Sequence, residues 1–540
     1  MNQRMPAPNH SDLTDRFEQL LGIGVALSRE RDINKLLEAI LLAAKDVTNA
    51  DGGTLYRMSD DDNKLNFAIV RNDSLGIAMG GTTDVEIPFY PVHLFLEDGS
   101  KNLQNVSAYA VHNDKSVNIV DAYTEQGFDF SGTKNFDKKT GYASHSFLTV
   151  PMKNHENEII GVLQLINAKD RVSGTAQPFS DSDQRLAESL ASQAAIALTN
   201  RLLINRLESL FESFISLINT AIDDKSPYTG GHCNRVPELT MMLAAAVTKT
   251  SVGPLKDFTM TDRDRYELRI AGLLHDCGKI TTPVHVVDKA TKLETIYDKI
   301  NLLDTRFEVL KRDMQIAALR GEISAPEIEA KFKAIEEDRA FLRHTNVGGE
   351  FMRDQDVERV KQIATAYQWV DPTGKECNFL SDDEVKNLTI RAGTLTMEER
   401  KVINHHIDLT INMLEALPWP KHLTKVPEYA GGHHERMDGK GYPRGLTREQ
   451  MSVQARCMGI ADIFEALTAK DRPYKKGKTL TESLNILGKM KLGQHIDPDL
   501  FDIFMWERVY EAYAHQYMSP EQIDNVDLSK VPGYVAPPAV

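Results

Sequence analysis

The pattern of apolar residues changes at about residue 183, and this change limits what the chain can fold into. Before it, apolar runs typical of strands, such as 52–58 and 159–168, are mixed with helical stretches. After it, almost every apolar repeat has the period of a helix. At 540 residues the chain is too long for one ordinary core, and roughly two to four domains are expected. The sequence therefore predicts an α+β domain followed by an all-α domain.

We expect four parts in the chain. They are an α+β sensor domain at 12–182, a long helical linker at 183–222, an all-α domain at 223–515 and a C-terminal tail at 516–540. A helix is expected to begin near Ser180, where the sequence SDSD offers N-cap side chains. The all-α domain is expected to carry an insertion at about 294–393.

The linker carries a heptad-like repeat. Its apolar residues are spaced alternately four and three apart: Leu203, Leu207, Leu210, Phe214, Leu217 and Ala221. This spacing is typical of a parallel coiled coil, and it predicts a homodimer joined along the linker. A single amphipathic helix that lies on its own domain is the alternative.

A second repeat occupies the first part of the insertion. It contains Ile296, Ile300, Leu303, Phe307, Leu310, Met314 and Ala317 and, after the turn-like RGEISAPE, Ile328, Phe332, Ile335 and Leu342. Two helices with a short turn between them predict an antiparallel hairpin. From about 343 to 393 the periodicity is weaker, and we assign no structure there.

Charge and composition narrow the classes of partner. The net charge of −15 argues against binding nucleic acid or a membrane through bulk electrostatics, so a phosphate ligand needs a local cluster of metal or basic side chains. The sequence has neither an apolar run of about 18 residues nor a signal-like start, which predicts a cytoplasmic protein. Without CxxC spacing, the cysteines favour neither a zinc knuckle nor a disulfide framework: Cys233, Cys277, Cys377 and Cys457.

Histidines, most of them close to acids, recur at four places in the chain, and the acids of a fifth stretch join them: 228–236, 273–279, 404–408 and 433–446, then 460–469. The apolar residues of 265–280 indicate a buried helix, so His275 and Asp276 should lie at the edge of a core. An unpaired carboxylate there is costly, and a metal ion would remove the cost. Taken singly, each histidine could be a surface, cap or ion-pair residue. Taken together, imidazoles and carboxylates are the ligand set of Mn, Fe, Zn and Ni sites.

The order of these motifs resembles the HD-GYP family, a branch of the HD-domain metal-dependent phosphohydrolases. Its members are associated with hydrolysis of the bacterial second messenger cyclic di-GMP. The resemblance runs from about 215 to 515 through AIDDKSPYTGGHCNRV, LLHDCGKITTP, GGHHERMDGKGYPRGL, IADIFEALTAKDRPYK and HIDPDLF. It implies an all-helical domain, a centre of two or three metal ions and a phosphodiester substrate. Fe or Mn is the expected metal, and Zn stays open.

The resemblance implies seven metal ligands: His232, His275, Asp276, His406, His433, His434 and Asp462. With Asp276 bridging, they fill about eight of roughly twelve positions around two octahedral ions. Adjacent helical residues project about 100° apart, so His433 and His434 are expected to reach different ions. Tyr228 stands where some members have a glutamate for a third metal, which favours two ions. Ile407 stands where the family has a proline.

The resemblance also implies catalytic and substrate-binding residues. Asp276 and Lys279 are the expected catalytic residues, at a metal centre whose activated water attacks phosphorus. The expected substrate contacts are Lys279, Gly441, Tyr442, Pro443, Arg472 and Lys475. The glycine-rich Tyr-Pro turn should lie at the substrate groove, with a purely structural turn as the alternative. The basic stretch 470–478 should contact phosphate or guanine, with a solvated loop as the alternative.

The N-terminal pieces 117–129 and 136–152 resemble the GAF family, particularly GAF domains attached to cyclic-nucleotide phosphodiesterases. The signature residues of that group fall at Asn167, Lys169, Phe179 and Asp183, although Ala168 interrupts the first pair and Gln184 replaces the final acid. These positions could be structural, for instance a Lys169–Asp183 ion pair. A domain that binds a small molecule and a dimerisation scaffold both stay open.

The resemblances together imply a GAF-regulated phosphodiesterase that hydrolyses cyclic di-GMP to pGpG or GMP. A receptor that binds the dinucleotide and signals to a partner without turnover, or with slow turnover, is one alternative. A hydrolase of another cyclic dinucleotide, such as cyclic GMP-AMP, is the other.

Overall fold

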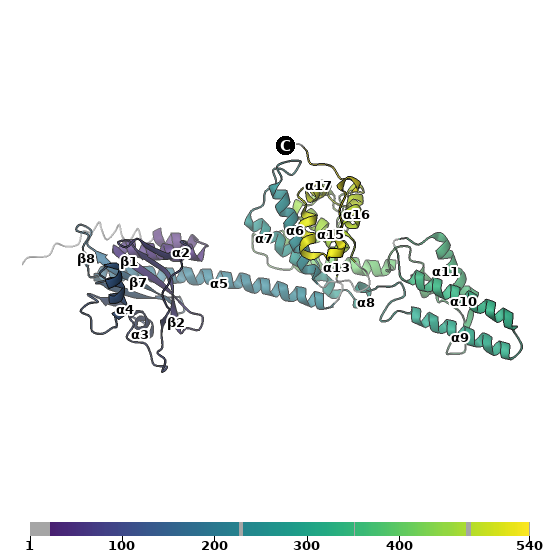
Figure 1. The fold of residues 1–540 in the computed structure, drawn as a ribbon, viewed down its shortest axis with the longest axis horizontal. Coiled ribbons are helices and arrows are strands. Elements are labelled where there is room, and N and C mark those ends of the chain that lie inside the picture. The colour runs from purple at the N-terminus through teal and green to yellow at the C-terminus, as the bar shows by residue number, and fades with distance from the viewer. Residues whose placement is uncertain (1–21, 226–230, 350, 471–476, 539–540) are drawn as a thin grey trace, which may run out of the picture. The chain divides into compact units, whose positions relative to one another are not determined.

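The computed structural model describes residues 22–225, 231–349, 351–470 and 477–538. The chain divides into two compact units, one that ends at Phe211 and one that begins at Glu212 (Figure 1). Within the described ranges, every helix is too short or too polar to cross a membrane.

The N-terminal unit is built on one antiparallel sheet. Its strands are β1 (Ala50–Met58), β2 (Lys64–Asn72), β3 (Ile77–Gly80), β4 (Val92–His93), β5 (Val117–Ile119), β6 (Phe147–Lys153), β7 (Ile159–Lys169) and β8 (Ala176–Gln177). They pair in the order β3-β2-β1-β7-β6-β5, with β4 beside β2 and β8 beside β7. The apolar runs 52–58 and 159–168, which predicted strands, lie in β1 and β7.

Helices cover both faces of this sheet. They are α2 (Ile33–Thr48), α3 (Val106–Asn113), α4 (Ser131–Thr140) and α5 (Asp181–Lys225). Successive strand residues point to opposite faces. Leu55 accordingly enters the core shared with α2 and the first part of α5, whereas its neighbour Tyr56 packs in the core that includes α3. The predicted α+β class is confirmed.

Helix α5 is continuous over 45 residues. It begins with a capping exchange, in which Ser180 N donates to Asp183 Oδ2 (3.0 Å) and Asp183 N donates to Ser180 Oγ (3.1 Å). Its residues between Ala187 and Leu198 enter the N-terminal core. The heptad residues that follow are largely exposed, from Leu203 at 44% to Leu207 at 64%. A coiled-coil seam needs such a free apolar stripe, and the homodimer stays a prediction.

The C-terminal unit is largely helical. Its elements outside the insertion are α6 (His232–Lys249), α7 (Asp262–Leu274), the 3-10 helix η1 (Cys277–Thr281), α8 (Val284–Val287), α13 (Met397–Glu415), α14 (Val426–Gly431), η2 (Arg448–Gln450), α15 (Val453–Thr468), α16 (Leu480–Leu492), α17 (Pro498–Trp506), α18 (Val509–Tyr517), η3 (Pro520–Gln522) and η4 (Leu528–Lys530). Helix α6 packs against both α7 and α15. A Cβ on Gly272 of α7 would lie 3.1 Å from the Cα of Pro237 in α6, so these helices meet at backbone distance.

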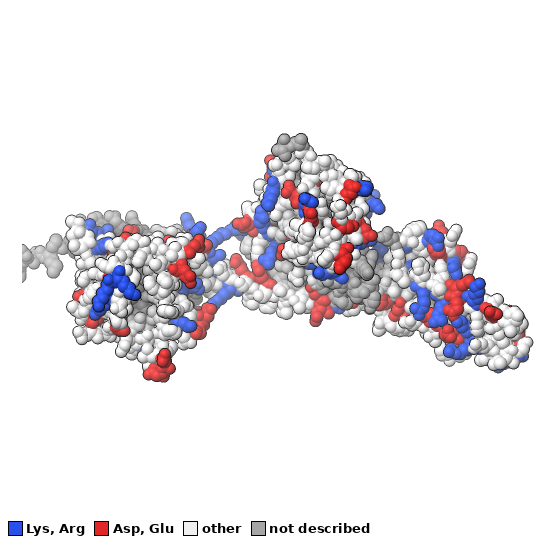
Figure 2. Space-filling view, in the orientation of Figure 1, with Lys and Arg blue, Asp and Glu red and all other residues white. Residues whose placement is uncertain are grey.

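The insertion has a core of its own. It contains α9 (Ile300–Leu319), α10 (Ala325–Asn346), α11 (Asp354–Ala366), β9 (Gln368–Val370), β10 (Glu376–Asn378) and α12 (Asp382–Leu388). Helices α9 and α10 form the expected hairpin, and Phe307 and Ile335 are buried in the shared core. Ile296 was wrongly included in the repeat, because it precedes α9 and is 96% exposed. Acidic and basic side chains are interspersed over these helices (Figure 2), as where Asp304 accepts hydrogen bonds from Arg339 and Arg343.

Candidate metal centre

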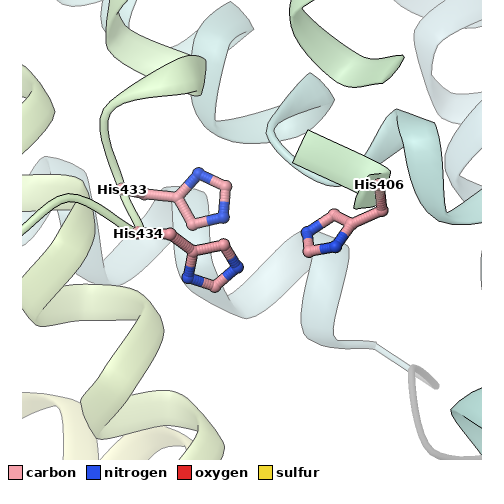
Figure 3. A group of neighbouring side chains, drawn as sticks. All are labelled: His406, His433 and His434. Atoms are coloured by element: carbon pink, nitrogen blue, oxygen red, sulfur yellow. The ribbon is translucent and has the colours of Figure 1, made fainter. Parts of the chain in front are cut away.

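The structure brings the seven predicted ligands together from separate elements. His232 opens α6, His275 and Asp276 lie between α7 and η1, His406 lies in α13, His433 and His434 follow α14, and Asp462 lies in α15. Two groups of donor atoms are each close enough to hold an ion: His232, His275 and Asp276, and His406, His433 and His434. Figure 3 shows the rings of the second group approaching one another from two sides. The sequence motifs therefore converge on one centre.

The carboxylate of Asp276 lies between the two groups. Its Oδ2 is 3.2 Å from Nε2 of His232 and 3.3 Å from Nε2 of His275. Its Oδ1 is 3.3 Å from Nε2 of His406. Asp462 lies beside the first group, with Oδ1 3.3 Å from Nε2 of His232. One oxygen of Asp276 thus faces each group, as a bridging ligand would.

Backbone carbonyls determine which ring nitrogen of three histidines faces this centre. Nδ1 contacts the carbonyl oxygen three residues earlier in His275 with Gly272 (2.7 Å), His406 with Ile403 (2.5 Å) and His433 with Ala430 (2.6 Å). A carbonyl oxygen can only accept, so each Nδ1 carries the proton. The lone pair of each Nε2 is left for a cation.

Unpaired acceptors show that the centre fits a metal. Asp276 Oδ1, His406 Nε2 and His433 Nε2 are buried and have no hydrogen-bond partner among the described residues. Each such atom costs about 1–3 kcal/mol. Since Nδ1 of His406 holds its proton, the lone pairs of His406 Nε2 and Asp276 Oδ1 face each other at 3.3 Å. A shared cation would turn this repulsion into two ligand bonds.

The charge states of several side chains also suit a metal. Burial lowers the pKa of His434 to about 4 and that of His433 well below its usual range, so both are neutral imidazoles. Burial would raise the pKa of Asp276, but its neighbours, first of all the ammonium of Lys279, hold that pKa well below its usual range. In His232 burial acts in the other direction and would lower the pKa, but Glu465 and the nearby aspartates raise it well above its usual value. His232 must therefore lose a proton when it binds a cation.

Glu465 is a member of the site that we did not predict. This buried carboxylate lies 2.5 Å from Nδ1 of His232 through Oε2 and accepts from Nε of Arg235 (2.7 Å) through Oε1. It stands three residues after Asp462 on α15, so the two acids lie on one face of that helix. This i, i+3 spacing was visible in the sequence.

Lys279 places a positive charge beside the centre. Its Nζ lies 2.5 Å from Asp276 Oδ2, and its side chain is 20% exposed. Burial would lower the pKa of this ammonium, but the carboxylates of Asp276 and Asp462 raise it above its usual value. Lys279 is therefore charged at neutral pH, as its expected role at a phosphate requires.

His433 and His434 lie in a turn beyond the end of α14, where the helical geometry behind our expectation does not apply. Their rings stand side by side, with centroids 4.1 Å apart. Both belong to the donor group of His406. The structure thus places them together, whereas the sequence argument assigned them to different ions.

The Gly-Tyr-Pro turn lies against these histidines. The ring of Tyr442 stacks on that of His434, with centroids 4.8 Å apart and planes inclined by 28°. A Cβ on Gly441 would lie 2.4 Å from Arg436 N and 2.5 Å from Glu435 Cα, so only glycine fits there. Pro443 follows Tyr442 through a cis peptide bond. The turn is thus part of the site.

Glu435 holds this turn in place, which we did not predict. The side chain is buried, and its two oxygens accept from the backbone N–H groups of Arg444 (2.8 Å) and Leu446 (2.9 Å). The acid that follows the two histidines in the sequence is therefore a loop anchor.

A cavity of about 490 Å³ opens beside the centre. Its walls include the ligands His433, His434 and Asp462 and the ring of Tyr442. Lys478, the last residue of the predicted basic stretch, also lines it, together with three basic side chains that we did not predict: Arg436, Lys440 and His495. Arg436 and Lys440 were within the histidine motif, whereas His495 is brought in by the fold. Arg472, Lys475 and Tyr228 lie outside the described residues.

The GAF signature residues make structural contacts in the N-terminal unit. The Asn167 side chain accepts from the backbone N–H groups of residues 145 and 146 and donates to the Ala143 carbonyl. Lys169 pairs with the buried carboxylate of Asp51. Phe179 is buried in the core, and Asp183 caps α5. These contacts favour a structural role for the signature.

Sequence profiles of known domains match both parts of the chain. The sequence profile of the GAF domain matches residues 32–198, and that of the HD domain matches residues 382–500. The second match contains His406, His433, His434 and Asp462, whereas the ligands of α6 and α7 precede it.

Curated relatives share parts of the chain. A "3'3'-cGAMP-specific phosphodiesterase 3" of Vibrio cholerae is 24% identical over 322 residues, which are 60% of this chain and 43% of that protein. A cyclic di-GMP phosphodiesterase of Pseudomonas aeruginosa is 44% identical over 115 residues, 21% of this chain and 27% of that protein. The chain thus spans less than half the length of these relatives. It joins a GAF domain to an HD domain, a kind of domain that binds divalent metal, and its histidines and aspartates form groups that could hold such ions.

Proposed function

We propose that the chain is a phosphodiesterase that uses two divalent ions, Fe or Mn, to hydrolyse cyclic di-GMP to pGpG, GMP or both, under control of the GAF domain. The observation that carries this proposal is the carboxylate of Asp276, whose two oxygens each face one group of nitrogen donors. Seven ligands around two ions leave positions for water and for phosphate oxygens. The bound ions would supply an activated water and neutralise charge on the phosphoryl group.

The chain's own residues would bind and orient the substrate. Lys279 carries the positive charge nearest to Asp276 and can donate to a phosphate oxygen. The ring of Tyr442 forms part of the cavity wall beside the centre, where a nucleotide base can pack. Arg436, Lys440 and His495 add donors along the same cavity.

Hydrolysis by direct attack of water is favoured over a covalent route through cysteine. Cys233 and Cys277 are the thiols next to metal ligands in sequence, and both are buried. Burial raises the pKa of Cys277 to about 11 and that of Cys233 further. Neither is a thiolate at neutral pH, and the thiolate is the nucleophilic form.

Cyclic GMP-AMP is the second candidate substrate. The relative that aligns over 322 residues is named for 3'3'-cGAMP, whereas the Pseudomonas relative, 44% identical over 115 residues, is named for cyclic di-GMP. Both names describe a cyclic dinucleotide with two phosphodiester bonds. The substrate class is therefore better supported than the choice of base.

The test is metal content and hydrolysis of both dinucleotides by protein purified without oxygen. We expect about two ions of Fe or Mn per chain and faster turnover of cyclic di-GMP. Asp276→Ala should abolish turnover, and His405→Ala should not, because His405 is exposed and pairs with Asp408. Faster turnover of cyclic GMP-AMP than of cyclic di-GMP would make cyclic GMP-AMP the preferred substrate and cyclic di-GMP the second candidate. Tight binding of a cyclic dinucleotide without turnover would indicate a receptor and contradict the proposed phosphodiesterase activity.

A further inference from the structure

The last residue of α5 is bound to the segment that follows the His-Asp pair. Lys225 Nζ donates to three backbone carbonyl oxygens, those of Lys279 (3.1 Å), Ile280 (2.5 Å) and Thr282 (2.6 Å). These carbonyls lie at the C-terminal end of η1 and just beyond it, and that of Lys279 also accepts from the backbone N–H of Thr282 (3.1 Å). An ammonium group has three donors and complements the negative end of a helix. Lys225 thus supplies hydrogen-bond donors to the carbonyl oxygens at this end of η1.

Backbone contact with α13 also holds η1. A Cβ on Gly278 would lie 2.0 Å from the carbonyl oxygen of His406 and 2.7 Å from Thr410 N. Gly278 N also donates to Thr410 Oγ1 (2.9 Å). The short segment that carries Asp276 and Lys279 is therefore held both by α13 and by the end of α5.

We propose that Lys225 is a positioning residue of the catalytic centre, which makes the end of α5 part of the site. The hydrogen bonds of Lys225 to residues 279, 280 and 282 reach main-chain oxygens and not the side chain of a metal ligand. It holds the main chain of Lys279, whose ammonium pairs with Asp276. A shift of Lys225 would displace this ammonium from the substrate phosphate. This inference rests on the proposed phosphodiesterase function and identifies a route for its regulation.

The N-terminal part of α5 belongs to the GAF domain and is the other end of the proposed route. Between Ala187 and Leu198, α5 contributes side chains to the core of the GAF domain. Ile222, three residues before Lys225, is 2% exposed, so one side of the last turn of the helix is buried in the C-terminal unit. A ligand of the GAF domain that rotates or shifts α5 would act on Lys225, and through its carbonyl contacts on Lys279.

The test compares three variants of the full chain: Lys225→Met, Lys225→Arg and, as a matched control, Lys256→Met at an exposed lysine of the same unit. Lys225→Met removes all three donors, and we expect kcat to fall by about 10- to 100-fold, the usual effect of a small misplacement, with KM little changed. Metal content should stay at the wild-type level. Lys225→Arg keeps charge and donors and should restore most of kcat. Lys256→Met should behave as wild type.

Amide hydrogen exchange provides a readout that needs no turnover. We expect faster exchange at residues 277–282 in Lys225→Met and unchanged exchange in the sheet of the GAF domain. Wild-type exchange and kcat in Lys225→Met would overturn the proposal. So would a loss of kcat that accompanies loss of metal and is not rescued by Lys225→Arg. If the wild type hydrolyses no cyclic dinucleotide, the proposed function fails, and exchange at 277–282 still decides whether Lys225 holds this segment.

Discussion

Oε2 of Glu465 lies 2.5 Å from Nδ1 of His232, so a carboxylate on α15 orients the first histidine of α6. His275, His406 and His433 use backbone carbonyls for the same purpose. A carboxylate partner makes an imidazole a more basic and stronger ligand than a carbonyl partner does. The affinity of the first donor group for a cation should therefore depend on Glu465.

Glu465→Gln should weaken metal binding by about 10- to 100-fold, the usual effect of removing such a partner. The measurement is a titration of metal-free protein with Mn²⁺. Glu449→Gln changes an exposed acid in the same unit and should leave the affinity unchanged. Equal affinities for the wild type and Glu465→Gln would show that Glu465 serves only to pair with Arg235.

The adjacent residues His405 and His406 offer a matched pair on α13. His406 is buried and has an unpaired Nε2, whereas the His405 side chain is 59% exposed and pairs with Asp408. His406→Ala should remove about one of two ions and lower kcat by more than about 100-fold. His405→Ala should keep both metal content and kcat. Metal analysis with kinetics checks both, and equal losses in the two variants would contradict the assignment.

The sequence predicted the residues that come together at the candidate centre, because each belongs to a local motif of histidines and acids. It could not predict their partners, because these depend on which elements pack together. Glu465 reaches His232 only where α15 packs on α6, although 233 positions separate them. His495 likewise enters the cavity from beyond α16. Short-range patterns identify such residue types, and tertiary packing decides their contacts.

Two predictions were wrong about where a helix begins or ends. Ile296 fits the heptad spacing of α9, but the helix begins at Ile300. The prediction places His433 and His434 on a helix, but α14 ends at Gly431. Spacing alone does not show where a helix ends, since capping contacts and backbone conformation decide that.

Gly441→Ala should destabilise the C-terminal unit by about 2–4 kcal/mol, because the new methyl group would meet backbone atoms of residues 435 and 436 that cannot move aside. Gly439→Ala should cost only about 1 kcal/mol, since Gly439 has a φ of +72° but more space. Thermal unfolding of both variants measures the difference. A Gly441→Ala protein as stable as the wild type would mean that the turn can open.

The buried Lys292 should make stability depend on pH. Its side chain is 3% exposed, and Nζ donates to the Leu388 carbonyl (2.9 Å). Burial lowers its pKa from 10.5 to about 8, although Asp356 opposes this. Between these two values the unfolded chain binds more protons than the folded one, so Lys292 makes stability rise with pH. Below about pH 8 the burial penalty is present in full.

Replacing Lys292 removes this dependence. From pH 8 to 10, the stability of the wild type relative to Lys292→Met should rise by about 2–3 kcal/mol. Chemical denaturation across this range is the measurement. Lys361→Met provides the control, because the Lys361 side chain is 56% exposed. A difference between wild type and Lys292→Met that does not change with pH would show that this ammonium is hydrated.

The exposed stripe of α5 tests the predicted homodimer. Leu207, Leu210 and Leu217 are each more than half exposed, at 64%, 52% and 63%. In a parallel coiled coil they would meet their counterparts, and a lysine at position 207 would place two like charges in the seam. Leu207→Lys should therefore convert a dimer into a monomer at micromolar concentration, as measured by light scattering. Glu208→Lys adds the same side chain one position away, outside the seam, and should leave the dimer intact. If the wild type is a monomer, α5 is a single helix, and any regulation by the GAF domain acts within one chain.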